Sequence, residues 1–140
     1  GLKRLKLEDR IRELLPVETS LPAPGQGALG VEVRADRKDL LELLAFINDE
    51  DIRCATGAER AVSRALGGSC QVPLAAHGIV ENGELWLRAH VGDHRDGRKI
   101  CAQARGKAAD FETVAAEVVA DLKAQGAEAL LAEVLAATAK

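Results

Sequence analysis

Three alternating segments separated by two turn dipeptides limit the fold of this chain more than any other feature. They cover residues 71–80, 84–91 and 98–105, and the dipeptides between them are Asn82-Gly83 and Asp96-Gly97. Asn-Gly and Asp-Gly favour tight hairpin turns, because these residues accept positive φ angles at low cost. In the middle segment every second residue is apolar, which gives a strand one apolar and one polar face. The pattern predicts a three-stranded antiparallel meander with one face covered by helices.

Helical patterns precede and follow the three segments. Before them, residues 51–66 have helical spacing, and Asn48 or Asp49 can cap this helix. After them, two apolar helices separated by a glycine are predicted, the first of them capped by Asp110. Residues 48–140 are therefore predicted to form a self-contained α+β domain.

The residues before this domain do not form a domain by themselves. Residues 7–15 have helical spacing, and a connector rich in proline and glycine follows at residues 16–30. Residues 28–35 alternate like a strand, and Asp36 can cap a helix with apolar side chains up to Ile47. A single strand leaves both of its edges unpaired, so we expect this strand to need a partner.

The composition excludes several classes of protein. Of the 140 residues, 47% are hydrophobic, which excludes a disordered chain, and only 2% are aromatic, which leaves little surface for stacking on bases. The formal net charge of −3 provides no field that recruits nucleic acid or an anionic membrane. No apolar run reaches the roughly 20 residues that span a bilayer. We therefore expect a soluble protein that binds neither nucleic acid nor membranes.

The three cysteines differ in their predicted surroundings. Cys54, Cys70 and Cys101 are an odd number without a Cys-x-x-Cys pair, which favours free thiols in a reducing cytosol. Cys54 and Cys101 lie in a predicted helix and strand, where a thiol usually acts as a small hydrophobic side chain. Cys70 lies in a loop of glycine and serine, where a thiol is exposed and able to react. No histidine or cysteine pair has the spacing of a structural zinc site, so no metal is expected.

Residues 25–30 match the pattern G-x-G-x-x-G of dinucleotide-binding proteins. That pattern binds pyrophosphate only where a strand precedes it and a helix follows. Here prolines precede it and a strand-like segment follows, which favours a flexible turn over a nucleotide site. Its backbone, at Gln26 and Gly27 in particular, can still approach a ligand closely.

Five segments, in this order and spacing, resemble the C-terminal part of the porphobilinogen deaminases, also called hydroxymethylbilane synthases. They are GLKRL (1–5), LPAPGQGALGVEVR (21–34), AERA (58–61), GGSCQVPLAAHG (67–78) and NGELWLRAHV (82–91). The resemblance covers essentially the whole chain. It implies a transferase of tetrapyrrole biosynthesis that joins four porphobilinogen molecules head to tail and releases ammonia at each step. Water then frees the linear product, hydroxymethylbilane.

The resemblance also implies roles for single residues. Cys70 matches the cysteine that carries the family's dipyrromethane cofactor through a thioether. Arg4 and Arg34 match arginines that bind the acetate and propionate groups of the pyrroles, since a guanidinium holds a carboxylate in a planar, bidentate fork. Gln26 and Gly27 would contact the cleft through their backbone. The family's catalytic aspartate lies outside this chain, so no catalytic residue is assigned here and the chain alone is expected to be inactive.

The family has three domains, of which the first two resemble the halves of a periplasmic binding protein. By this resemblance, residues 1–18 end domain 2, residues 19–27 form a hinge or crossover, residues 28–47 return to domain 1, and residues 48–140 form the cofactor-carrying α+β domain. The chain begins at Gly1 and contains no methionine, so we expect a processed chain or a fragment. The N-terminal half of the enzyme is then the expected partner, and the complete enzyme is expected to be a cytoplasmic monomer.

Two other functions fit parts of the sequence. The first is a non-catalytic small-molecule-binding or regulatory module, because α+β domains of this kind serve many functions. A covalently modified thiol at Cys70 would distinguish the enzyme from such a module. The second is a dinucleotide-binding enzyme, which would require residues 25–30 to open a helix.

Overall fold

The computed structural model describes residues 1–67 and 72–138. Its helices and strands follow one another in the order η1 (Glu8–Arg10), α1 (Lys38–Leu44), η2 (Ala45–Ile47), α2 (Glu50–Ala65), β1 (Leu74–Glu81), β2 (Glu84–Gly92), β3 (Lys99–Lys107), η3 (Ala108–Asp110), α3 (Phe111–Ala124) and α4 (Ala127–Thr138). Elements labelled η are short 3-10 helices. The described part of the chain thus places its three strands between helices, as the sequence pattern predicts.

The three strands form one antiparallel sheet in the order β1-β2-β3, which confirms the predicted meander. In the central register Gly78 pairs with Leu87, and Leu87 pairs with Ala104. Asn82 and Gly83 have φ angles of 53° and 77°, so the first hairpin has the primed turn that its dipeptide favours. The strand pairing gives the same hairpin, since Glu81 pairs with Glu84 on either side of this turn.

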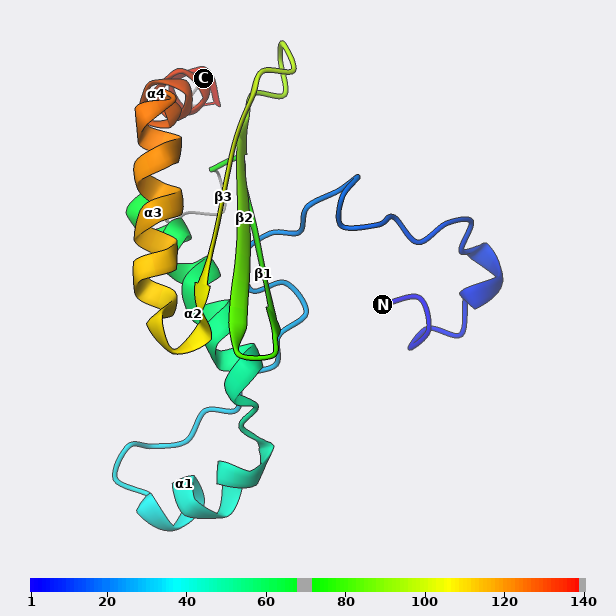
Figure 1. Cartoon of the computed structure of the whole chain (residues 1–140). Helices are drawn as coiled ribbons and strands as arrows, with labels where there is room; N and C mark the ends of the chain where they lie inside the picture. Colours follow the sequence, from blue (N-terminus) through cyan, green and yellow to red (C-terminus); the bar gives the residue numbers. More distant parts are fainter. Residues whose placement is uncertain (68–71, 139–140) are drawn as a thin grey trace.

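Helices α2, α3 and α4 lie on one side of the sheet, and no helix of the described chain covers the opposite face (Figure 1). Alternate residues of β2 enter the core between sheet and helices. The largest side chains that are fully buried there are Leu85, Leu87, Leu122, Val62, Val91 and Val118. The side chain of Asp49 caps α2 by accepting a hydrogen bond from the backbone N–H of Ile52 at 3.0 Å. Residues 48–67 and 72–138 therefore form one α+β unit, called the C-terminal unit below.

One predicted strand, one predicted helix and two predicted helix caps are wrong, and all but one of the caps lie in the first 47 residues. Residues 28–35 form no strand, because no strand in the described part of the chain pairs with them. Of the predicted helix 7–15 only the 3-10 turn η1 forms, since so short a helix is marginal without a surface to pack on. Asp36 does not cap α1, because its carboxylate binds the Arg34 guanidinium instead. In the C-terminal unit, Asp110 precedes α3 but makes no side-chain cap bond.

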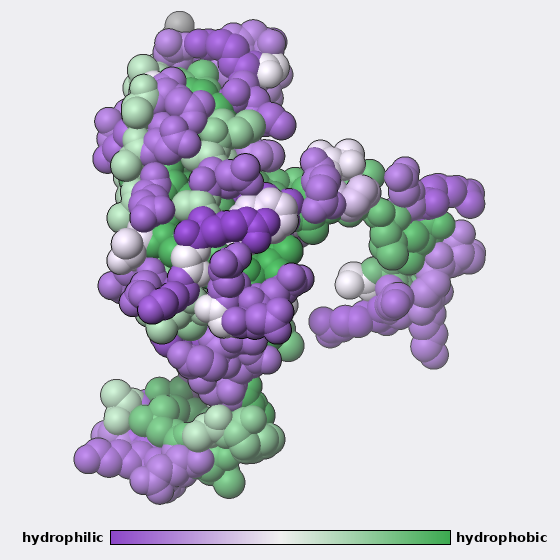
Figure 2. All heavy atoms as spheres, in the orientation of Figure 1, coloured by the Kyte–Doolittle hydropathy of each residue, from purple (hydrophilic) through white to green (hydrophobic). Residues whose placement is uncertain are grey.

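The segments outside the C-terminal unit expose large apolar side chains. Figure 2 shows apolar side chains on the surface of the segment that contains α1. Leu29 is 99% exposed and Phe46 is 82% exposed, which is far more than such side chains show in the core of a folded domain. These segments therefore have the pattern of elements that pack against another part of a protein.

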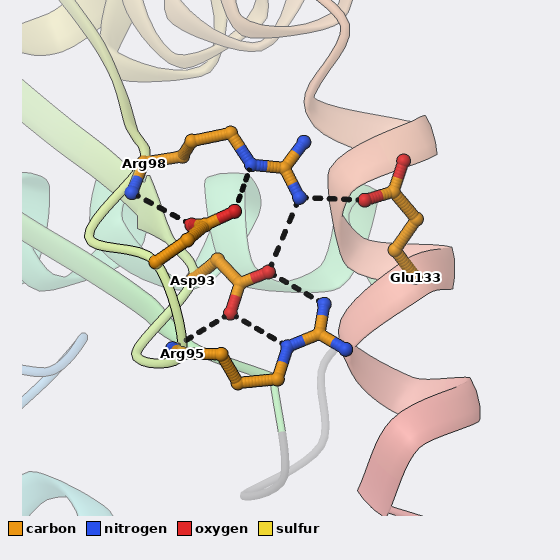
Figure 3. Close-up of polar contacts among 5 residues, drawn as sticks. Asp93, Arg95, Arg98 and Glu133 are labelled. Atoms are coloured by element: carbon orange, nitrogen blue, oxygen red, sulfur yellow. Dashed lines mark hydrogen bonds and ion pairs between the residues drawn. The ribbon is translucent and has the colours of Figure 1, made fainter.

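A cluster of charged side chains fixes the loop between β2 and β3 to α4 (Figure 3). The Asp93 side chain is fully buried and accepts hydrogen bonds from the Arg95 guanidinium, at 2.9 and 2.6 Å, and from the Arg95 backbone N–H. The Arg98 guanidinium lies 3.3 Å from Asp93 and donates to Glu133 of α4 at 2.7 Å. The Arg95 contacts hold the pKa of the Asp93 carboxyl well below its ordinary value.

Truncation of a core side chain should destabilise the C-terminal unit. Leu87 is fully buried, so Leu87→Ala removes apolar contacts and leaves a cavity, at a cost of roughly 2–5 kcal/mol. Leu43→Ala, at a position that is 66% exposed, should change stability by less than about 0.5 kcal/mol. Urea unfolding followed by circular dichroism measures both values. Equal losses for the two variants would contradict the assigned core.

Asp93 should make the free energy of unfolding depend on pH. Because its pKa is lower in the folded than in the unfolded chain, its contribution is complete above its ordinary pKa of about 4 and is lost as the pH falls through the folded-state value. We expect Asp93→Asn to be less stable than the wild type at pH 7, and its urea midpoint to fall less steeply below about pH 4.

The matched control for Asp93 is Glu117→Gln, which removes the same charge at an exposed position on α3. This control should keep the acid dependence of the wild type. A slope for Asp93→Asn equal to that of the wild type would show that the buried ion pairs do not carry this dependence.

Candidate functional site

The connector, residues 16–30, lies against the C-terminal unit. The Pro22 carbonyl accepts a hydrogen bond from the Ala76 backbone N–H of β1 at 3.0 Å. The Gly25 backbone N–H donates to Oε2 of Glu59, on α2, at 2.6 Å. The proline-rich segment is therefore held by both a strand and a helix of the C-terminal unit.

A hollow of about 630 Å³ lies beside this connector. One wall is the glycine-rich segment 25–30, and the other is α2 together with residues 47–49 just before it. The α2 side chains that line it are Ile52, Arg53, Thr56 and Arg60. Arg53 and Arg60 supply cations that can bind carboxylate groups, and the one carboxylate among the described lining residues, Asp49, caps α2 by accepting from the Ile52 backbone N–H.

Three arginines of α2 lie on or beside this hollow. Arg53 donates to Glu50 at 2.7 Å and lies over the Phe111 ring, with its guanidinium carbon 5.5 Å from the centroid. Arg60 and Arg64 are exposed and line a neighbouring depression together with Arg53. The hydrogen bond with Glu50 raises the pKa of Arg53 above its ordinary value, so this guanidinium stays charged.

Arg34, predicted to bind a pyrrole carboxylate, lies in the extended segment before α1. Its guanidinium forms a bidentate ion pair with the Asp36 carboxylate, which includes an Nε to Oδ1 distance of 3.0 Å. This contact lowers the pKa of Asp36 below its ordinary value. The Arg34 side chain is 79% exposed, so a ligand carboxylate can reach it and compete with Asp36.

The other predicted contacts lie in different places. Arg4 is exposed in the N-terminal segment, which Figure 1 draws on the open side of the sheet and far from the segment that contains Arg34. Gly27 lines the hollow, whereas Oε1 of Gln26 accepts a hydrogen bond from the Ala23 backbone and so stabilises a turn. The structure does not bring Arg4 and Arg34 together, and their roles stay predictions.

Cys70, the predicted attachment point, lies outside the described residues. Its neighbours in the sequence are described: α2 ends at Ala65, and β1 begins at Leu74. Cys54 is buried, and burial raises the pKa of its thiol, which confirms its part in the core. Cys101 is exposed on β3, so the prediction of a packed side chain there is wrong, because this residue lies on the open face of the sheet.

Sequence analysis missed Glu59 and Arg60, although both stand in the segment AERA. The signal for Glu59 was its place on the buried face of α2, one turn from Ala55 and Val62. A carboxylate on an apolar helix face needs hydrogen-bond donors from another element. The signal for Arg60 was its helical spacing from Arg53 and Arg64, which gathers three cations along one helix.

No group of three or more histidine, cysteine, aspartate or glutamate side chains in the described part of the chain has the arrangement of a metal site. Among the helices described, none has both the length and the apolar character needed to cross a membrane.

Comparison with known proteins matches both parts of the chain. A family model described as the C-terminal domain of porphobilinogen deaminase matches residues 52–124, and one described as its dipyromethane cofactor binding domain matches residues 1–42. The porphobilinogen deaminase of Burkholderia vietnamiensis is 50% identical over 139 residues, which are 97% of this chain and 42% of that protein. Those of Burkholderia thailandensis and Burkholderia mallei are 48% identical over 143 residues, covering 100% of this chain and 44% of each protein. The chain therefore spans less than half the length of these curated relatives.

Proposed function

Because the chain belongs to the porphobilinogen deaminase family, we propose that it is the C-terminal part of a hydroxymethylbilane synthase. The complete enzyme would join four porphobilinogen molecules head to tail, release ammonia at each step, and free the linear tetrapyrrole by hydrolysis. The observation that carries this proposal is that two family models match the chain in succession, at residues 1–42 and 52–124. The relatives that agree in sequence over both regions are named porphobilinogen deaminases.

The residues of the chain fit a dipyrromethane cofactor, which carries acetate and propionate groups. Cys70 would hold it through a thioether, and the described residues on both sides of the connector supply guanidinium groups for the carboxylates. Arg34 and Arg60 are exposed, and the hollow beside Arg60 has room for carboxylate groups. When bound, this group would supply the free pyrrole α-carbon to which the first substrate molecule is added.

The arginines of this chain would bind and orient the growing chain rather than transfer protons. A guanidinium stays charged at all physiological pH values and fixes a carboxylate through two parallel hydrogen bonds. We assign Arg4, Arg34, and the backbone at Gln26 and Gly27, to this task. The catalytic aspartate would come from the part of the enzyme that this chain does not span.

Two described carboxylates near the connector, those of Glu59 and Asp36, are already engaged by other groups of the chain. Both oxygens of Glu59 accept backbone hydrogen bonds, and Asp36 is engaged by Arg34. This distribution of contacts supports a chain that contributes binding groups and leaves the stabilisation of developing positive charge to another domain.

The exposed apolar segments would pack against the N-terminal half of the enzyme. Residues 1–18 would complete domain 2, residues 19–27 would form the crossover, and residues 28–47 would complete domain 1, both domains being like the halves of a periplasmic binding protein. The strand predicted at 28–35 would form on pairing with the sheet of domain 1, which would also cover Leu29 and Phe46. The complete enzyme would be a cytoplasmic monomer.

Mixing two halves of the enzyme tests these proposals together. Residues 1–140 alone should form no hydroxymethylbilane, because the catalytic aspartate is absent. When they are mixed with the part of the Burkholderia vietnamiensis enzyme that the chain does not span, we expect a one-to-one complex in gel filtration and product formation from porphobilinogen.

Cofactor attachment is measured in the same mixture by intact-mass spectrometry and peptide mapping. The complex should gain the mass of two linked pyrrole units on Cys70, and Cys70→Ser should gain none and stay inactive. Cys101→Ser is the matched control, and it should keep both the added mass and the activity. A complex that forms but leaves Cys70 unmodified and makes no product would favour a non-catalytic binding module.

Loss of Arg34 should slow chain elongation without unfolding the protein. Arg34→Ala in the assembled enzyme removes a charge-assisted contact of about 1.5–3 kcal/mol, so the rate should fall roughly 10-fold to 100-fold. Arg12→Ala, at another exposed arginine, is the control and should leave the rate unchanged. Normal elongation by Arg34→Ala, measured by product formation and by the masses of the enzyme-bound intermediates, would remove the assignment.

A further inference from the structure

Glu59 connects three segments that are distant in the sequence. It lies on α2 and is 5% exposed. Its Oε1 accepts a hydrogen bond from the Gly78 backbone N–H of β1 at 2.8 Å, and its Oε2 accepts one from the Gly25 backbone N–H of the connector at 2.6 Å. One carboxylate therefore joins the helix, the strand and the connector.

This contact depends on a close approach between α2 and β1. A Cβ atom at Gly78 would lie 3.2 Å from both the Cα and the carbonyl oxygen of Ala55, which is tighter than ordinary packing. The absence of a side chain at Gly78 thus lets the helix backbone lie directly on the strand. At this separation the Glu59 carboxylate reaches the backbone of β1.

The arrangement needs a carboxylate rather than any side chain that fills the same space. A buried carboxylate is costly without hydrogen-bond donors, and here each oxygen receives one from backbone. His77, the neighbour of Gly78 in β1, places its Nδ1 3.5 Å from Oε1 of Glu59. An amide in place of the carboxylate would offer one acceptor only and would turn an NH2 group toward a backbone N–H.

The connector is held on the C-terminal unit at three points. Besides the Glu59 contact, the Pro22 carbonyl accepts from the Ala76 N–H, and Glu18 accepts from the Arg88 guanidinium at 3.1 Å. In the described structure, the hydrogen bonds of residues 26–37 reach only nearby positions of the same segment. Attachment therefore ends near Gly25.

We propose that Glu59 is a positioning residue that fastens residues 18–25 to the C-terminal unit, so that the chain pivots on either side of them, before Glu18 toward the N-terminal segment and in residues 26–37 toward α1. The proline-rich part of the connector then moves with the C-terminal unit. On this proposal, the hinge predicted for residues 19–27 would lie outside residues 18–25. Since Cys70 stands in the sequence between α2 and β1, which Glu59 joins, the same carboxylate would keep these two flanking elements and the connector in one fixed relation, a consequence that rests on the proposed function.

Amide hydrogen exchange on residues 1–140 tests the position of the pivot. In Glu59→Gln the amides of Gly25 and Gly78 should exchange about 10-fold faster or more than in the wild type, since each loses a charged acceptor. The Ala76 amide should also exchange faster as the connector detaches, whereas the core amide of Ala89 should keep its wild-type rate. Glu117→Gln should change none of these rates.

Two outcomes of the exchange experiment would overturn the proposal. One is an unchanged rate at Gly25, which would mean that Glu59 does not hold the connector. The other is an equal acceleration at Gly25 and Ala89, which would mean that Glu59 only contributes to global stability.

If Glu59→Gln does not fold, a measurement on the wild-type protein still tests the proposal. Scalar couplings across hydrogen bonds, recorded by NMR, should join the Glu59 carboxyl carbon to the amide nitrogens of both Gly25 and Gly78. Couplings to both nitrogens support the connection. A coupling to Gly78 alone would mean that Glu59 does not hold Gly25, and it would refute the proposed attachment of the connector.

The effect on the reaction is measured in the assembled enzyme. Glu59→Gln should lower product formation while the mass added at Cys70 stays at one cofactor per chain, since attachment needs the thiol and turnover needs the fixed connector. Wild-type turnover by Glu59→Gln would refute this consequence. An inactive wild-type assembly would instead refute the proposed function, and the exchange rates would still decide whether Glu59 holds the connector.

Discussion

The packing of α2 on β1 is the contact on which the described structure depends. Because Gly78 carries no side chain, the helix backbone lies against the strand, and Glu59 reaches the strand and the connector at once. Core side chains of β2 then fill the space between the sheet and the helices. The charged cluster around Asp93 fixes the far end of the β2–β3 hairpin to α4. Sheet, helices and connector thereby form one unit.

The two parts of the chain differ in how far they complete their own packing. The C-terminal unit buries an apolar sheet face under helices, as an independent domain does. The region before it leaves side chains such as Leu29 and Phe46 in contact with solvent. This contrast, together with the short span of the chain against its relatives, supports the assignment of the first 47 residues to domains completed by another part of the enzyme.

Predictions from local patterns succeeded where both the signal and the partner lie within the chain. The Asn82-Gly83 hairpin and the cap at Asp49 formed as expected, because turn and cap chemistry act over a few residues. The strand at 28–35 failed, because a strand is stabilised by a neighbour that its own sequence does not specify. Of the candidate site, the resemblance supplied Cys70, Arg4 and Arg34, whereas the buried role of Glu59 was missed.

The sequence by itself determined the class of the fold, the order of its elements and the family, since these depend on periodicity, turn dipeptides and motif spacing. Only the tertiary structure decided which backbone groups meet the Glu59 carboxylate, and that Arg34 is engaged by Asp36 while Arg4 lies elsewhere. The physical reason is that a hydrogen bond between distant segments depends on how closely two elements pack. That distance is set by all the side chains between them and not by any local pattern.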